Sequence, residues 1–165
     1  MIYILMESYG HVSICKCEKY DCYLMRCILK NVQYTPLKWV IFLADIKKSL
    51  LRIKESHSIT NFILQLDITH LDMFMSSDRY EEFTNVIKLF KELFMSKLLG
   101  SIVYIESNVC KFIINMSMKF YLPIKPLFIL NHSLDVTNTE PTNNDAKIID
   151  DLNNNIKNEN EYIIK

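Results

Sequence analysis

The stretch Phe62-Ile63-Leu64-Gln65-Leu66-Asp67-Ile68 decides the fold of this chain, because it is a short and nearly continuous apolar run. The run is rich in strand-forming residues, and such a pattern is typical of a strand that is covered on both faces. We therefore predict that this stretch is the central strand of a sheet, and the neighbouring segments are interpreted around it.

Before the central strand, alternating residues from His11 to Asn31 predict a hairpin with a polar turn at residues 18–21. Thr35 and Pro36 are a typical N-cap and first residue of a helix, which we expect to end near Glu55. Its packed face is predicted from apolar residues at three-to-four spacing. These residues are Leu37, Val40, Ile41, Leu43, Ile46, Leu50 and Leu51.

After the central strand, Asp78 and Glu81 resemble a capping box and predict a helix that Gly100 ends. A buried strand over residues 101–106, a helix over 109–121 and a last strand over 125–131 should follow. The element order is then β-β-α-β-α-β-α-β. The expected fold class is α/β, with a small mixed β-sheet of about five strands and three helices.

The chain is expected to form one domain over residues 1–132, followed by a tail over 133–165. The tail holds 7 of the 19 acidic residues but only 3 of the 19 basic residues, and it is rich in Asn. Such a composition buries too little apolar surface to offset the entropy of ordering, so we predict a disordered acidic tail. Weak docking is allowed at residues 148–152 and 162–164.

Composition excludes several classes of protein. No apolar run is long enough for a membrane span, and the start of the chain lacks the pattern of a signal peptide.

The 5 cysteines are an odd number, which favours free thiols and a cytoplasmic location. Basic residues form no stripe, so no nucleic-acid partner is expected. With only 2 Gly, no phosphate-binding loop fits, so no cofactor is expected.

The segment Asp67-Ile-Thr-His-Leu-Asp-Met-Phe-Met-Ser-Ser-Asp78 resembles the signature region of STAS (anti-sigma-factor-antagonist-like) domains. In that family a strand ends in Asp-Leu-Ser, and an apolar loop and Asp-Ser-Ser-Gly follow. Met75 stands where the family has Asp, and Asp78 where it has Gly. The composition is also typical of AT-rich genomes, such as those of some large DNA viruses.

The resemblance implies a STAS-like fold and a non-enzymatic module that regulates a protein partner through this loop. It implies that Ser77, with Ser76 beside it, is the phosphoacceptor. The residues that would contact the partner are Leu71, Met73, Phe74, Met75 and Asp78. The competing interpretation is that Ser76, Ser77 and Asp78 are ordinary N-cap residues.

A lipid-binding domain and an enzyme are the two alternative functions. The element order is also similar to that of CRAL-TRIO domains, which would imply a lipid ligand. An enzyme is not expected, since no nucleophile is paired with a base and no catalytic residue stands out. A zinc site at Cys15, Cys17, Cys22 and Cys27 has the wrong spacing, so strand packing is preferred and no metal is expected. The four histidines are interpreted as surface or cap residues.

Overall fold

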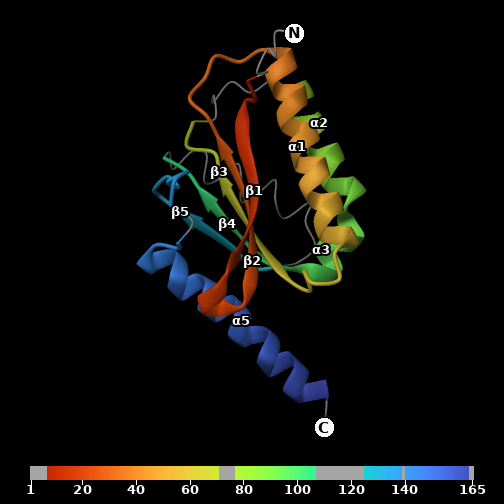
Figure 1. Cartoon of the computed structure of the whole chain (residues 1–165), viewed down its shortest axis with the longest axis vertical. Helices are drawn as coiled ribbons and strands as arrows, with labels where there is room; N and C mark the ends of the chain where they lie inside the picture. Colours follow the sequence, from red (N-terminus) through yellow and green to blue (C-terminus); the bar gives the residue numbers. More distant parts are fainter. Residues whose placement is uncertain (1–6, 71–76, 107–124, 139, 164–165) are drawn as a thin grey trace.

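The computed structural model describes residues 7–70, 77–106, 125–138 and 140–163, without the side chains of Ser77, Tyr80 and residues 156–163. A five-stranded sheet forms the centre of the molecule, in the order β1-β2-β3-β4-β5 (Figure 1). One pair, β1 and β2, is antiparallel, and the other neighbours are parallel. The mixed α/β sheet predicted from the sequence is therefore confirmed.

The predicted hairpin is present as β1 (Gly10–Cys17) and β2 (Cys22–Leu29), joined by the short 3-10 helix η1 (Glu18–Tyr20). Asp21 completes the turn with φ 47, in the left-handed region that Asp tolerates better than most residues. The predicted central strand is β3 (Phe62–Asp67), and all of its residues are buried. It lies between β2 and β4, in the middle of the sheet.

Helix α1 (Pro36–Glu55) begins and ends where the sequence predicts. Thr35 caps it, since the Thr35 hydroxyl accepts a hydrogen bond from the backbone N–H of Lys38 at 3.2 Å. The predicted packed face is partly wrong, because Leu37, Val40 and Leu51 are exposed. One side of a helix cannot bury every apolar residue at mixed three-to-four spacing. The side chains that are buried are Trp39, Phe42, Leu43, Ile46, Leu50 and Ile53.

The single helix predicted before Gly100 is two helices, α2 (Ser77–Leu89) and α3 (Lys91–Lys97), with a break at Phe90. Strand β4 (Leu98–Tyr104) then starts earlier than predicted, and Gly100 lies inside it. A Cβ atom on Gly100 would stand 2.7 Å from the Leu152 side chain, so the glycine permits close packing in the strand and does not end a helix.

Strand β5 (Leu127–Leu130) is the predicted last strand, shortened at both ends. The helix predicted over residues 109–121 lies outside the described residues. Helix α5 (Asn143–Ile163) was not predicted. It corrects the expectation that residues 133–165 are disordered, because Ile149 and Leu152 of this segment are buried at 0% and 2% exposure. The described residues thus contain four α-helices.

The helices lie on both faces of the sheet (Figure 1). Helices α1, α2 and α3 cover one face, where Phe42, Phe62 and Phe94 belong to the larger apolar cluster. Helix α5 covers part of the other face, where Ile149 and Leu152 join a smaller cluster with strand residues. No helix among the described residues is long and apolar enough to cross a bilayer.

Candidate functional site

The loop expected to carry function is bounded by two described points. Strand β3 ends at Asp67, and α2 starts at Ser77, with Asp78 exposed in its first turn. Residues 68–76 join these two points, and the predicted helix start near Asp78 is present. The structure does not describe the positions of Leu71, Met73, Phe74, Met75 and Ser76, nor the side chain of Ser77.

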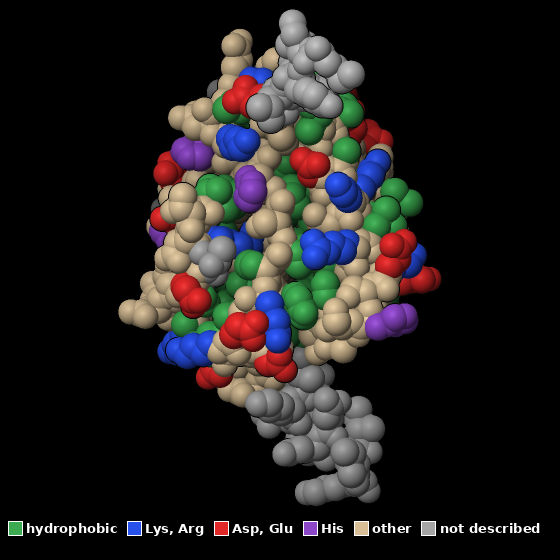
Figure 2. All heavy atoms as spheres, in the orientation of Figure 1, with side chains coloured by type: hydrophobic (Ala, Val, Ile, Leu, Met, Phe, Trp, Pro, Cys, Tyr) green, Lys and Arg blue, Asp and Glu red, His purple; other side chains and the backbone are tan. Residues whose placement is uncertain are grey.

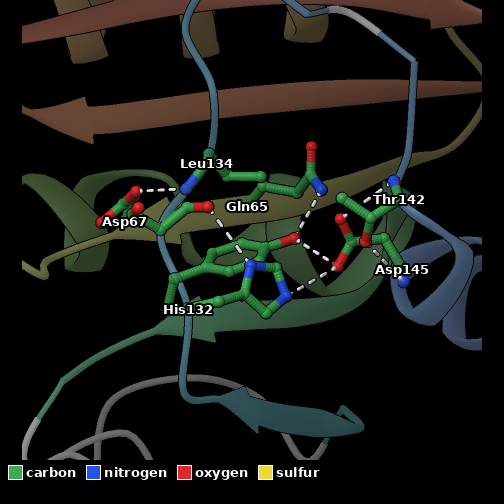
Figure 3. Close-up of polar contacts among 8 residues, drawn as sticks. Gln65, Asp67, His132, Leu134, Thr142 and Asp145 are labelled. Carbon is green, nitrogen blue, oxygen red and sulfur yellow. Dashed lines mark hydrogen bonds and ion pairs between the residues drawn. The ribbon is translucent and has the colours of Figure 1, made fainter.

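Asp67 fixes the place where the chain leaves the central strand (Figure 3). Its Oδ1 accepts hydrogen bonds from the backbone N–H of Thr69 at 2.9 Å and from the Thr69 hydroxyl at 2.7 Å. Its Oδ2 accepts a hydrogen bond from the backbone N–H of Leu134 at 2.6 Å. Both oxygens of this buried carboxyl group are therefore engaged in holding the backbone, in agreement with a turn residue rather than a catalyst.

A second polar cluster lies beside Asp67 on the face of the sheet that α5 covers (Figure 3). The side-chain amide of Gln65 on β3 donates to the hydroxyl of Tyr104 on β4 at 2.7 Å. That hydroxyl donates to Oδ1 of Asp145 on α5 at 3.0 Å. The Nε2 atom of His132 lies 3.8 Å from the same oxygen, and the His132 ring meets the Tyr104 ring edge to face at 5.0 Å.

Asp145 is in the cluster because of the way α5 begins. Thr142 is the N-cap, and its hydroxyl accepts from the N–H of Asp145 at 3.4 Å, while Asp145 Oδ2 accepts from the N–H of Thr142 at 3.4 Å. This reciprocal arrangement is a capping box. A carboxylate at this position also faces the positive end of the helix dipole. The sequence Thr142-Asn-Asn-Asp145 therefore both starts the helix and places its acid beneath the sheet.

Arg26 holds the connection between β5 and α5 against the sheet. Its two terminal nitrogens donate to the carbonyl oxygens of Asn138 at 2.8 Å and Asp135 at 3.1 Å. Arg26 and Gln65 also line a cavity of about 20 Å³, which has room for about one water molecule. Within the described residues, Arg26 Nε and Gln65 Oε1 have no hydrogen-bond partner. The cavity has the size and polarity to hold a bridging solvent molecule.

The polar cluster has a structural role, because its hydrogen bonds join separate elements of the fold. Burial, reinforced by the neighbouring Asp145 carboxylate, raises the pKa of Tyr104 far above its usual value, so the group stays a phenol that donates its proton. Among the described residues, the His132 ring nitrogens lie near the Asp145 carboxylate and the backbone carbonyl of Ser133. Its bonds join β3, β4 and α5, and they hold the end of the chain to the second face of the sheet.

The cysteines on the hairpin behave as packing residues. Burial raises the pKa of the Cys22 thiol to about 11 and that of the Cys27 thiol to about 12, so both stay protonated at neutral pH. Cys17 and Cys22 lie in the cluster under α5, whereas Cys27 lies in the cluster on the opposite face. Across the described residues, no three His, Cys, Asp or Glu side chains gather into a metal-binding group.

Sequence reasoning missed the polar cluster. His132 was interpreted as a surface or cap residue, yet Nε2 of its half-buried ring is enclosed and lies near Asp145. The spacing from Thr142 to Asp145 was the signal that could have revealed the start of α5. The Asn-rich composition of the segment obscured this signal.

No protein-family model, curated protein or solved structure matches this chain.

Proposed function

We propose that this chain is a non-enzymatic, STAS-like regulatory module that binds a protein partner through the loop after β3 and the start of α2. The observation that carries the proposal is that α2 is the next described element after the central strand and has the exposed Asp78 in its first turn. Ligands of open α/β sheets bind at this end of the strands. Asp67 supports the proposal because its three hydrogen bonds fix the point where the loop leaves the strand.

The proposed phosphoacceptor is Ser77, which is the first residue of α2. A phosphate there would face the free N–H groups at the start of the helix, which favour a negative charge. The exposed Asp78 carboxylate is next to it in sequence and would oppose that charge. A docked partner would then meet a surface whose charge has become more negative by almost two units, about −1.5 to −2 at neutral pH.

Close packing beneath the helices favours a binding surface over a lipid carrier of CRAL-TRIO type. Side chains of α1, α2, α3 and the sheet, including Leu50, Leu64, Ile87 and Phe94, leave a cavity of about 10 Å³ between them. A pocket for a lipid-sized ligand is about thirty times larger or more. The protonated, unpaired thiols on the hairpin agree with the proposed cytoplasmic location, where thiols stay reduced.

The test compares Ser77→Glu and Ser77→Ala with Asn85→Glu, a control that adds the same charge on an exposed position two turns further along α2. Each variant is used to capture partners, which are measured by quantitative mass spectrometry. Ser77→Glu should lower recovery of a specific partner about tenfold. Ser77→Ala and Asn85→Glu should recover it as the wild type does. Equal recovery by all proteins would contradict phosphate control of docking.

A second measurement separates the binding module from the carrier. Native mass spectrometry of the gently purified protein should give the mass of the chain alone. A stoichiometric lipid adduct that is lost on denaturation would contradict the proposal and favour the CRAL-TRIO-like function.

A further inference from the structure

A second surface, made of other residues, lies along the edge of the sheet. Strand β1 pairs with β2 on one side and is the edge of the described sheet. Alternate backbone N–H and C=O groups of an edge strand point outward and can pair with another extended chain. β1 is eight residues long and contains no proline, and no other strand among the described residues pairs with its outer side.

An open groove lies between this edge and α1. It has a volume of about 660 Å³, and it is lined by Gly10, His11 and Val12 of β1 and by residues of α1 between Asp45 and Arg52. Figure 2 shows the furrow between the strand and the helix, with basic side chains along the helix side. Gly10 lets the strand approach α1 closely, since a Cβ atom there would stand 2.4 Å from the Phe42 ring.

The groove carries an excess of positive charge. Lys30, Lys48 and Arg52 line it, and in the part of the chain that the structure describes no ion pair joins any of them to a carboxylate. Of the two acidic residues in the lining, Glu7 is already bound to Lys38 at 2.8 Å, which leaves Asp45. The lining therefore has mixed charges with a positive excess, and such an excess favours a ligand that carries negative charge.

We propose that this groove binds an acidic segment of a partner protein in extended conformation, added as a strand to the free edge of β1. The backbone of β1 supplies hydrogen bonds. Lys48 and Arg52 on α1, together with Lys30 directly after the end of β2, select carboxylate side chains. The groove is bordered by residues 10–12 at the start of β1 and by α1 and is partly apolar at Val12, so it fits a peptide better than a single compact anion. This docking is independent of Ser77 and of the surface at the start of α2.

The experiment measures binding of a fluorescein-labelled peptide of alternating Glu and Val to the whole chain by fluorescence anisotropy. Binding should weaken as salt is added, because exposed charges are screened. Lys48→Glu combined with Arg52→Glu should weaken it about tenfold. Lys47→Glu is the matched control, since Lys47 is exposed on the same helix but does not line the groove, and it should bind as the wild type does.

Peptides that are N-methylated at alternate residues test the strand pairing. One of the two methylation registers removes the donors that face β1 and should abolish binding, whereas the other should leave it intact. Hydrogen exchange should also slow at backbone amides of β1 when the unmethylated peptide is bound. Equal binding by both registers would overturn the strand addition.

Three other outcomes would overturn the proposal. These are no binding of the Glu-Val peptide, equal binding of a Lys-Val peptide, and tight binding of inositol hexakisphosphate where the peptide fails. The last result would show that the groove is an anion site for a compact phosphate ligand. Circular dichroism of each variant confirms that the fold is retained before binding is compared.

Discussion

Removal of the Tyr104 hydroxyl group should measure how much its hydrogen bonds stabilise the packing of α5 against the sheet. In Tyr104→Phe, Asp145 loses a hydrogen bond of 3.0 Å, and Gln65 loses the acceptor for its side-chain amide at 2.7 Å. A hydrogen bond to a charged group contributes about 1.5–3 kcal/mol, and a buried donor left without a partner costs about 1–3 kcal/mol. With partial relaxation, we expect the free energy of unfolding to fall by about 3 kcal/mol.

Urea unfolding followed by circular dichroism is the appropriate assay. With a slope of about 2 kcal/mol per molar urea, the expected loss lowers the transition midpoint by about 1.5 M. Tyr23→Phe is the matched control, because Tyr23 is half-buried on β2 but takes no part in the cluster. It should shift the midpoint by less than about 0.3 M.

A double variant tests whether the loss of stability comes from the Gln65 side-chain amide, which has no acceptor in Tyr104→Phe. Gln65→Leu in the Tyr104→Phe background removes the unpaired donor together with its former acceptor. It should recover about 1 kcal/mol, since replacing both partners of a buried bond by apolar groups is less costly than replacing one. If Tyr104→Phe alone stays within about 0.5 kcal/mol of the wild type, the reasoning about this cluster is refuted.

Gly10→Ala should lower the melting temperature, because the new Cβ atom would stand 2.4 Å from the Phe42 ring. Adding Phe42→Leu to this variant should restore part of the lost melting temperature. An unchanged melting temperature in Gly10→Ala would contradict the close approach of β1 to α1. Burial raises the pKa of Cys27 from 9.0 to about 12, so the unfolded chain loses this proton first. The contribution of Cys27 to the free energy of unfolding should therefore be constant below about pH 9 and fall by about 1.4 kcal/mol per pH unit between about pH 9 and 12. Cys27→Ala should remove that contribution in urea titrations, and equal slopes would refute it. Ile149→Ala should lower the free energy of unfolding, measured in urea, by about 2–4 kcal/mol, because Ile149 is fully buried. Ile148→Ala should lower it clearly less, because Ile148 is only half-buried. Equal losses in the two variants would contradict the way α5 packs on the sheet.

The sheet could be predicted from the sequence because its signals are local. The apolar run from Phe62 identified the buried central strand, and Thr35 with Pro36 identified the start of α1. The break at Phe90 could not be predicted in this way, because Ile87, Phe90 and Phe94 keep the spacing of one continuous helix. All three are buried, so the pattern reports the packed side but not the interruption.

The polar cluster could not be assembled from the sequence, because its members are far apart in the chain. Gln65 and Tyr104 are 39 positions apart, and Tyr104 and Asp145 are 41 positions apart. Each looked ordinary in its own segment. Composition was misleading for residues 143–163, where two buried apolar side chains, Ile149 and Leu152, are set among many polar residues. Docking to the sheet stabilises a helix that its composition alone would not predict.

The order of the elements along the chain has a consequence for synthesis on the ribosome. The five strands of the described sheet are translated before residue 131, whereas the helix that covers part of the second face begins at Asn143. Until Ile149 and Leu152 emerge, apolar residues of β2 and β3 that pack against them, such as Leu24 and Ile63, lack these contacts on the nascent protein. Bare sheet surface of this kind attracts chaperones and aggregates readily. A premature stop codon before residue 143 would remove these contacts permanently.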